Sequence, residues 1–224
     1  MPAVPEPLET LAFHDFVGTG FRIGDAVVPA GGECLVLTET AEQAGEVLNC
    51  LAGLQTPTWG RGSLFGRDLG SLPSDERLRV LAQIGIVPRD GGLLTVLSAS
   101  QNILLPRQYR SNARAEDLED EREEALRFCE AVGEAPREWI DLPPDYLSQY
   151  QRRLAGFLRL MLCQPAVCLY ENLLGNLHTR QKESLLKLTR QFHQRQPGRT
   201  SVYLEFDPGL RAEDWPGLVL QAIP

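Results

Sequence analysis

The stretch that most constrains the fold spans residues 32–54 and reads GECLVLTETAEQAGEVLNCLAGL. Its apolar run at residues 34–37 predicts a buried strand. A helix is predicted to follow, and its apolar face comprises Val47, Leu48, Leu51 and Leu54. A buried strand, a tight turn and a helix in this order form the frame of a motif that binds nucleotide phosphates.

The turn between this strand and this helix lacks the residues that bind phosphate. A phosphate loop is rich in glycine and ends in Lys followed by Ser or Thr. Here residues 38–46 read TETAEQAGE, and no lysine lies between Gly32 and Arg61. The frame of the motif is therefore present without its phosphate-binding groups.

Length and composition limit the remaining possibilities. A chain of 224 residues with 43% hydrophobic residues suits one α/β domain with a full core. The net charge of −8 argues against a nucleic-acid partner, because such binding depends on Lys and Arg. His14, His178 and His193 share no ligand spacing with the five cysteines, so no metal site is expected. Neither a signal peptide nor a membrane span is expected.

The other apolar segments predict the rest of the fold. Glycine-interrupted apolar segments at residues 8–31 predict short antiparallel strands, and buried strands are predicted at 84–87, 167–170, 201–204 and 218–220. Helices are predicted at 147–162, with Arg152, Arg153 and Arg159 off its apolar side, and at 179–194. The expected fold is a single α/β domain over residues 1–224. It has a mostly parallel sheet, an N-terminal antiparallel β part and a helical subdomain at about 90–150.

This order of elements resembles the ATP-binding subunit of ABC transporters over nearly the whole chain, and so implies a core like that of P-loop NTPases. Five segments carry the resemblance, at residues 32–35, 48–60, 65–69, 84–106 and 147–170. Within the fourth, the sequences GGLL and NILLP look most like the Mla-type ATPases that power lipid-trafficking transporters. The chain thus resembles a degenerate member of this family.

The resemblance assigns family positions to the residues of the turn. Aligned through residues 49–54, the phosphate-binding lysine falls on Ala44. The loop glycines fall on Thr38, Ala41 and Gln43, and the Ser/Thr pair falls on Gly45 and Glu46. Glu42 and Glu46 add negative charge where a triphosphate would lie. Two like charges ~4 Å apart cost roughly 4 kcal/mol at an effective dielectric constant of about 20.

The other nucleotide-site positions of the family are also changed. The aspartate that orients magnesium and the general-base glutamate correspond to Glu171 and Asn172, and an amide cannot accept a proton. The LSGGQ segment reads LSQYQ at residues 147–151, which keeps Ser148. The loop glutamine, the Asp of a Leu-Asp pair and the switch histidine correspond to Arg89, His178 and Phe206. Phe16 and Phe21 are the candidates for stacking on adenine, with a core role as the alternative.

These changes predict a pseudo-ATPase, a subunit with no catalytic residue, bound nucleotide or cofactor. Residues 88–106 correspond to the surface that grips the permease in the family. The candidate docking residues are Arg89, Asp90, Leu93, Leu94, Val96, Leu104 and Leu105. The implied partner is a transmembrane permease subunit, joined by an intact ATPase subunit or a second copy of this chain. The implied location is cytoplasmic, on the inner face of the membrane.

Three alternatives stay open at this point. The chain could be a nucleotide-sensing protein in which Arg61, Arg67 or Arg89 replaces the missing lysine. It could be a soluble regulatory protein that has lost contact with transporters. It could also be a residual ATPase that works only beside an intact partner subunit.

Overall fold

The N-terminal part of the chain forms an antiparallel sheet. The computed structural model describes residues 9–111, 118–206, 210, 213 and 215–224. In the N-terminal sheet, β1 pairs with β2, β3 and β5, and β5 pairs with β6. The strands are β1 (Glu9–Val17), β2 (Arg22–Ile23), β3 (Ala26–Pro29), β5 (Trp59–Leu64) and β6 (Arg67–Asp68).

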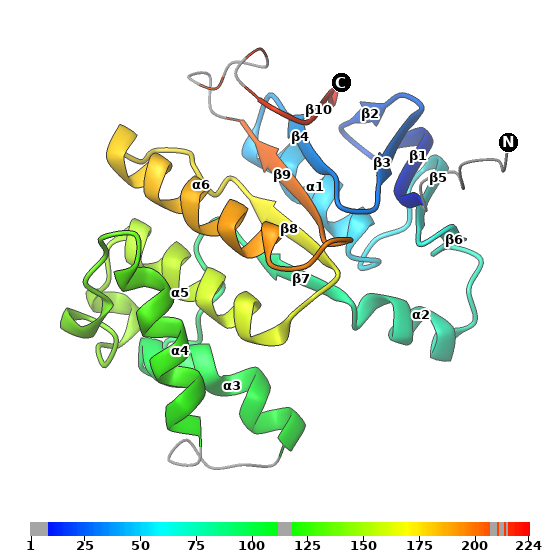
Figure 1. Cartoon of the computed structure of the whole chain (residues 1–224). Coiled ribbons are helices and arrows are strands. Elements are labelled where there is room, and N and C mark those ends of the chain that lie inside the picture. The colour runs from blue at the N-terminus through cyan, green and yellow to red at the C-terminus, as the bar shows by residue number, and fades with distance from the viewer. Residues whose placement is uncertain (1–8, 112–117, 207–209, 211–212, 214) are drawn as a thin grey trace, which may run out of the picture.

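The second sheet is parallel throughout and lies at the centre of the molecule (Figure 1). Its order is β10-β4-β9-β8-β7. Its strands are β4 (Glu33–Leu37), β7 (Ile84–Val87), β8 (Val167–Glu171), β9 (Thr200–Glu205) and β10 (Leu218–Gln221). The predicted parallel sheet with an antiparallel N-terminal part is confirmed.

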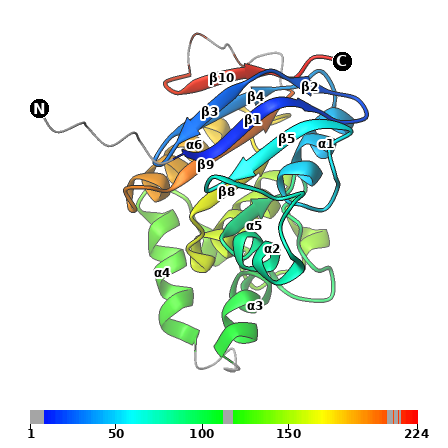
Figure 2. The same ribbon diagram turned by 90° about the vertical axis from the view of Figure 1, so that its right-hand side faces the viewer.

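Helices cover both faces of the parallel sheet. One face packs against α1 and the other against α5 and α6. The α-helices of the described residues are α1 (Ala41–Leu51), α2 (Ser74–Leu81), α3 (Ala99–Ser111), α4 (Glu119–Glu130), α5 (Gln149–Cys163) and α6 (Thr179–Gln194). Together with α3 and α4, the 3-10 turns η2 (Pro136–Glu138) and η3 (Pro144–Tyr146) form the predicted helical subdomain (Figure 2). The exact limits of 90–150 stay a prediction. Among the described residues, no helix combines the length and the apolar character that crossing a bilayer requires.

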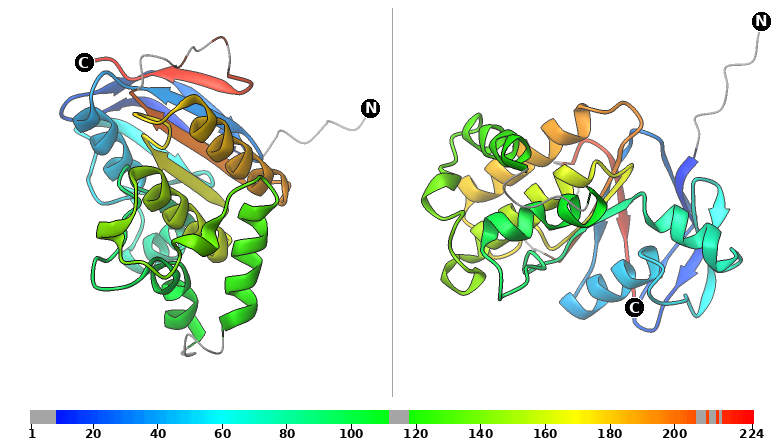
Figure 3. Two further views of the ribbon diagram at one scale, coloured as in Figure 1. Left: turned by 90° about the vertical axis from the view of Figure 1, so that its left-hand side faces the viewer. Right: turned by 90° about the horizontal axis from the view of Figure 1, so that it is seen from below.

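Strand alternation divides the core into two clusters. On β4, Cys34 and Val36 point to the cluster that includes α1, whereas Leu35 points to the cluster that includes α5 and α6. The cluster around α1 also contains Leu11 and Phe13 of the antiparallel sheet. The helix α1 is therefore packed between the two sheets (Figure 3). This packing explains why the apolar frame of residues 32–54 is kept.

The end of α1 differs from the sequence prediction. The helix ends at Leu51, and Gly53 follows with a left-handed φ of +67°. Leu54 is therefore not on the apolar face of the helix, and its side chain is 75% exposed.

All five cysteines are free, and all but Cys163 are buried.

Leu104 was predicted to dock a partner, and this prediction is wrong. Its side chain is 2% exposed and belongs to the core cluster shared by α3 and α5. The helix α3 presents Leu104 to α5, so the residue packs the helical subdomain onto the core. Leu93 and Leu105 are half-buried, and Leu93 also packs against this cluster.

We predict that Leu104→Ala lowers the free energy of unfolding by about 2–5 kcal/mol, because it removes buried methyl groups and leaves a cavity. The control is Leu94→Ala, which truncates a leucine that is 49% exposed and should cost about 1 kcal/mol or less. Urea denaturation followed by circular dichroism measures both. Equal losses in the two variants would contradict the burial assigned to Leu104.

Candidate functional site

Side chains accept hydrogen bonds from two backbone N–H groups between β4 and the first turn of α1. Thr40 caps α1, and its hydroxyl accepts a hydrogen bond from the N–H of Gln43 at 3.2 Å. The side-chain carbonyl of Gln43 accepts one from the N–H of Glu39 at 2.7 Å. In a phosphate loop, N–H groups at these places point at the nucleotide. Here the side chains of Gln43 and Thr40 accept hydrogen bonds from two of these N–H groups.

The turn between β1 and β2 is tied to the same end of α1. The amide nitrogen of the Gln43 side chain donates to the carbonyl of Gly20 at 2.9 Å, and the Glu46 carboxylate accepts from the N–H of Gly20 at 2.8 Å. Phe16 and Phe21 lie at either end of this turn, and both are 1% exposed with ring centroids 5.5 Å apart. Both rings are core residues, so neither presents an exposed face to an adenine.

The position of the missing lysine is closed. Ala44 is fully buried, and a Cβ on the neighbouring Gly45 would lie 3.6 Å from a carboxylate oxygen of Glu171. The other oxygen of Glu171 accepts the N–H of Arg89 at 3.2 Å. The structure thus brings the altered turn, Glu171 and Arg89 together at the carboxyl ends of the parallel strands, where open α/β sheets bind ligands.

The side chain of Asn172, which the family resemblance places at the general-base position, points toward the loop that follows β8. The residue has a φ of +42°, which asparagine tolerates, and is 2% exposed. A Cβ on Gly175 would lie 2.2 Å from its side-chain oxygen, so this amide lies against the loop that follows β8. In this place the amide can neither accept a proton nor reach solvent.

Arg153 is a buried positioning residue that the sequence prediction missed, because it placed this arginine off the apolar side of its helix. Its Nε donates to the carbonyl of Arg89 at 2.8 Å, and its Nη1 donates to those of Leu173 and Gly175 at 3.1 and 2.6 Å. Burial lowers the pKa of this guanidinium, and the carboxylate of Glu205 acts in the opposite direction. Arg153 thus joins the loop after β7, the loop after β8 and α5.

The loop after β7 rests directly on the backbone of α5. A Cβ on Gly156 would lie 2.5 Å from the carbonyl oxygen of Gly91, and a Cβ on Gly91 would lie 2.2 Å from that of Arg152. Arg159 donates to the carbonyls of Gly92 and Gly91 at 2.6 and 3.1 Å. Glycine is required at this close approach, and it fixes the loop to α5.

Five other candidate residues lie outside this cluster of contacts. Ser148 caps α5, where its hydroxyl accepts from the N–H of Gln151 and the Gln151 side chain accepts from the N–H of Ser148. His178 precedes α6 and is exposed. Phe206 follows β9 and packs, partly buried, against the core cluster around α1. Arg61 and Arg67 lie on β5 and β6 of the antiparallel sheet, and Arg67 pairs with Glu76.

The segment before α3, residues 94–98, is called here the docking loop. Asn102 of α3 is fully buried and holds it with four hydrogen bonds. Its oxygen accepts from the N–H of Leu94 at 2.7 Å, and its nitrogen donates to the carbonyls of Leu94, Leu97 and Ser98 at 3.0, 3.2 and 3.0 Å. In the sequence this asparagine is part of NILLP, and its role in holding the loop was not predicted.

The docking loop presents apolar side chains to solvent. Val96 is 88% exposed, Leu94 is 49% exposed and Leu142 is 41% exposed. The carbonyl of Leu142 accepts the N–H of Ala99, which places the two segments side by side. Arg89 and Asp90 are also exposed. Of the predicted docking residues, Arg89, Asp90, Leu94 and Val96 are therefore available to a partner.

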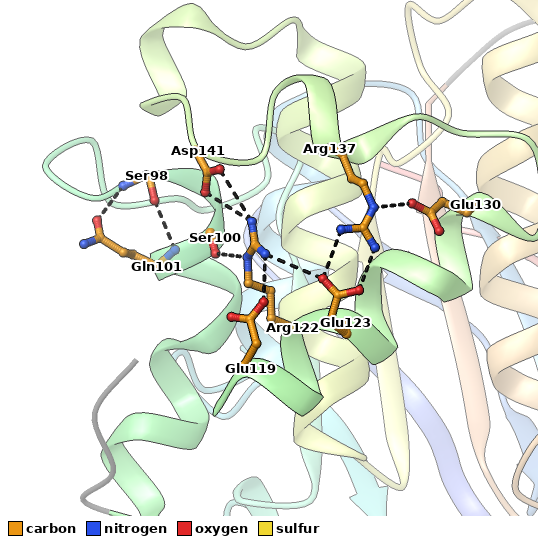
Figure 4. A network of polar contacts seen from close by, with 9 residues as sticks. All are labelled: Ser98, Ser100, Gln101, Glu119, Arg122, Glu123, Glu130, Arg137 and Asp141. Carbon is orange, nitrogen blue, oxygen red and sulfur yellow. Dashed lines mark hydrogen bonds and ion pairs between the residues drawn. The ribbon is translucent and has the colours of Figure 1, made fainter. Parts of the chain in front are cut away.

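A polar network supports this surface from behind (Figure 4). Arg122 of α4 donates to Ser100 at 3.1 Å and pairs with Asp141 at 3.5 Å, so α4 is joined to the helix that follows the docking loop and to the residue before Leu142. Arg137 pairs with Glu123 at 2.6 Å and with Glu130 at 2.7 Å. The network therefore links α4, the start of α3 and the segment around residue 141.

Solved structures share the fold. The ATP-binding cassette MJ0796, in a dimeric state bound to ADP and Pi, superposes with a TM-score of 0.71 at 19% identity over 88% of each chain. CbiO1 from Clostridium perfringens, part of the ABC transporter complex cbiONQ, superposes with a TM-score of 0.75 at 14% identity, over 96% of this chain and 87% of that one. The predicted ABC-ATPase fold is confirmed.

Curated sequences agree with this fold. The macrolide export ATP-binding/permease protein MacB of Rhodopirellula baltica is 30% identical over 200 residues, which cover 84% of this chain and 28% of that protein. The methionine import ATP-binding protein MetN of Brucella abortus is 27% identical over 168 residues, 75% of this chain and 44% of that protein. This chain thus spans less than half the length of these relatives. No protein-family model matches it.

Fold and sequence similarity together identify the chain as an ATP-binding cassette domain of the ABC transporter type. Its sequence is similar to the ATP-binding parts of MacB and MetN.

We predict that Asn102→Ala lowers the free energy of unfolding by about 2–4 kcal/mol, because it leaves buried backbone groups of the docking loop without partners. The matched control is Gln101→Ala, which removes an exposed side chain one residue away that accepts only the N–H of Ser98. Thermal unfolding measures both variants. An Asn102→Ala protein as stable as Gln101→Ala would contradict this role.

Proposed function

We propose that this cassette is a pseudo-ATPase that neither hydrolyses ATP nor binds it, and that it acts as a structural or regulatory subunit. The observation that carries the proposal is the closed loop before α1. The Gln43 side chain accepts a hydrogen bond from the N–H of Glu39, and the Thr40 hydroxyl accepts one from the N–H of Gln43. The Glu46 carboxylate accepts one from the N–H of Gly20. A nucleotide phosphate would have to displace each of these bonds without a lysine to attract it.

The end of β8 supports the same proposal. Asn172 offers no base, and Glu171 is engaged by the N–H of Arg89. A carboxylate without a neighbouring lysine repels a phosphate rather than binding it. Binding and chemistry are thus weakened at separate places in the site, so restoring one residue does not restore activity.

The proposed partner is a transmembrane permease, which the chain would contact with the docking loop on the cytoplasmic face of the membrane. The relatives support this choice: MacB is described as an ATP-binding/permease protein, and CbiO1 is part of a transporter complex. The exposed Leu94 and Val96, held by Asn102, form a preformed apolar contact. Because Arg153 and Arg159 fix the preceding loop to α5, this contact keeps its shape without nucleotide.

The proposed assembly also includes a second cassette. MJ0796 is dimeric, and a second copy of this chain or an intact ATPase subunit would fill the same role here. In a dimer with an intact ATPase subunit, the phosphate loop of that subunit would face Ser148 and the N-terminus of α5, which Ser148 and Gln151 cap. The residual-ATPase alternative rests on this retained serine.

The proposed cargo is a lipid. The support is the resemblance of GGLL and NILLP, within residues 91–106, to Mla-type sequences. MacB and MetN are described as serving macrolide export and methionine import, and these cargoes differ from each other as well as from lipid.

Mg-ATP at millimolar concentration should leave the melting temperature of the protein unchanged. Ala44→Lys should still lack ATPase activity in a phosphate-release assay, because Asn172 and the bonds of Gln43 remain. A ligand at 100 times its dissociation constant would stabilise the fold by about 2.7 kcal/mol, which is readily detected. A clear upward shift in the wild type, or turnover in Ala44→Lys, would overturn the pseudo-ATPase proposal.

Leu94→Asp combined with Val96→Asp should abolish co-purification of a permease with the tagged protein from native membranes, because it places two charges in the apolar contact. Leu78→Asp is the control, since Leu78 is 65% exposed and lies on α2, away from the docking loop. Circular dichroism verifies that both variants are folded. Retention of the permease by the folded double variant would exclude the docking loop as the contact.

A further inference from the structure

A hollow of about 150 Å³ lies between the antiparallel sheet and the end of α1, away from the closed phosphate loop. Its inner wall is apolar and formed by core residues, all 9% exposed or less: Leu11, Phe16, Cys50, Leu51, Leu64 and Leu69. An apolar cavity of about this size holds a ligand as large as benzene. The hollow is therefore large enough for an apolar group of about six carbon atoms.

The strand β5 forms part of the wall of this hollow. Alternation along the strand places Gly60, Gly62 and Leu64 on the face that lines the hollow. Gly60 has a φ of +69°, and a Cβ there would lie 1.9 Å from the carbonyl oxygen of Asp15. Gly62 has no such backbone requirement, and a Cβ there would lie 3.0 Å from the ring of Phe16. Glycine at position 62 therefore lets the Phe16 ring lie against β5 in the wall of the hollow.

The mouth of the hollow is polar and carries a free cation. Gln55, Thr56, Asp68 and Arg77 line it. The Asp68 carboxylate accepts the N–H of Gly70 at 2.9 Å, and Glu76 pairs with Arg67 instead of its neighbour Arg77. Within the described part of the chain, no carboxylate forms an ion pair with Arg77. A ligand with a negative charge at the mouth would find this guanidinium available.

Two exposed leucines are sequence neighbours of residues that line the hollow. Leu54 is 75% exposed and stands between the lining residues Gly53 and Gln55, and Leu78 is 65% exposed and follows Arg77 on α2. Leu81, one turn further along α2, packs on Gly53, so this face of α2 is turned toward the hollow.

We propose that this hollow binds a small organic acid, with an apolar body of about six carbons inside and its carboxylate on Arg77. The inference is independent of the proposed pseudo-ATPase function, because none of the lining residues belongs to the loop before α1. The chemistry requires both parts of the ligand. The wall rejects charge, and the guanidinium favours a carboxylate over a neutral oxygen.

The test is a titration of the ¹⁵N-labelled full chain, followed by NMR, with hexanoate, hexan-1-ol and acetate at neutral pH and constant salt. Hexanoate should bind saturably with a dissociation constant on the order of a millimolar, as expected for a ligand of this size. Its shifts should map to the lining residues. Hexan-1-ol and acetate should bind about tenfold more weakly or not at all, because each lacks one of the two parts.

Two variants and a control separate the parts of the site. Arg77→Gln should weaken hexanoate binding about tenfold, whereas Arg79→Gln, an exposed arginine on the same helix outside the lining, should not change it. Gly62→Val should abolish binding, because its side chain would push on the Phe16 ring in the wall of the hollow, and the melting temperature reports whether the variant is folded. If Gly62→Val does not fold, the comparison of Arg77→Gln with Arg79→Gln tests the proposal. Equal binding of hexanoate and hexan-1-ol, or hexanoate affinity unchanged in Arg77→Gln, would overturn the proposal.

Discussion

The hydrogen bonds of Gln43 are the constraint on which the site depends. A strand that leads into a helix leaves backbone N–H groups without partners, and something must satisfy them. In a phosphate loop the nucleotide does so. Here the Gln43 side chain accepts from the N–H of Glu39 and donates to the carbonyl of Gly20. The backbone N–H of Gln43 donates to the hydroxyl of Thr40. Two of these N–H groups therefore have partners without a ligand, and the turn at Gly20 is bonded to the start of α1.

The frame survives because the core requires it. The helix α1 is packed between two sheets, and Val47 and Leu51 contribute to the cluster that joins them. These contacts join apolar side chains, so they do not require a phosphate-binding residue in the turn. Arg153 and Asn102 serve a different purpose. Arg153 holds the loop after β7, and Asn102 holds the docking loop with its exposed apolar residues. A rigid exposed surface of this kind is consistent with a subunit that binds a protein partner rather than a nucleotide.

The fold could be predicted from the sequence because strand alternation and helix periodicity are local signals. The positions of the altered turn and of Glu171 also followed from the resemblance. The contacts of Gln43 with Gly20 and of Arg153 with Leu173 could not be predicted, because they join residues about 20 apart through side-chain geometry. Leu104 was misplaced for a related reason. Its exposure depends on which side of α3 faces α5, and a continuous apolar run does not specify this.

Backbone amide exchange at Glu39 and Gln43 tests the central claim most directly. Without nucleotide, both amides should exchange slowly with deuterium, because the Gln43 and Thr40 side chains hold them in hydrogen bonds. Mg-ATP should change neither their exchange nor their chemical shifts. Fast exchange in the free protein that becomes protected when Mg-ATP is added would contradict this account, since it would mean that the loop is open and its donors bind phosphate.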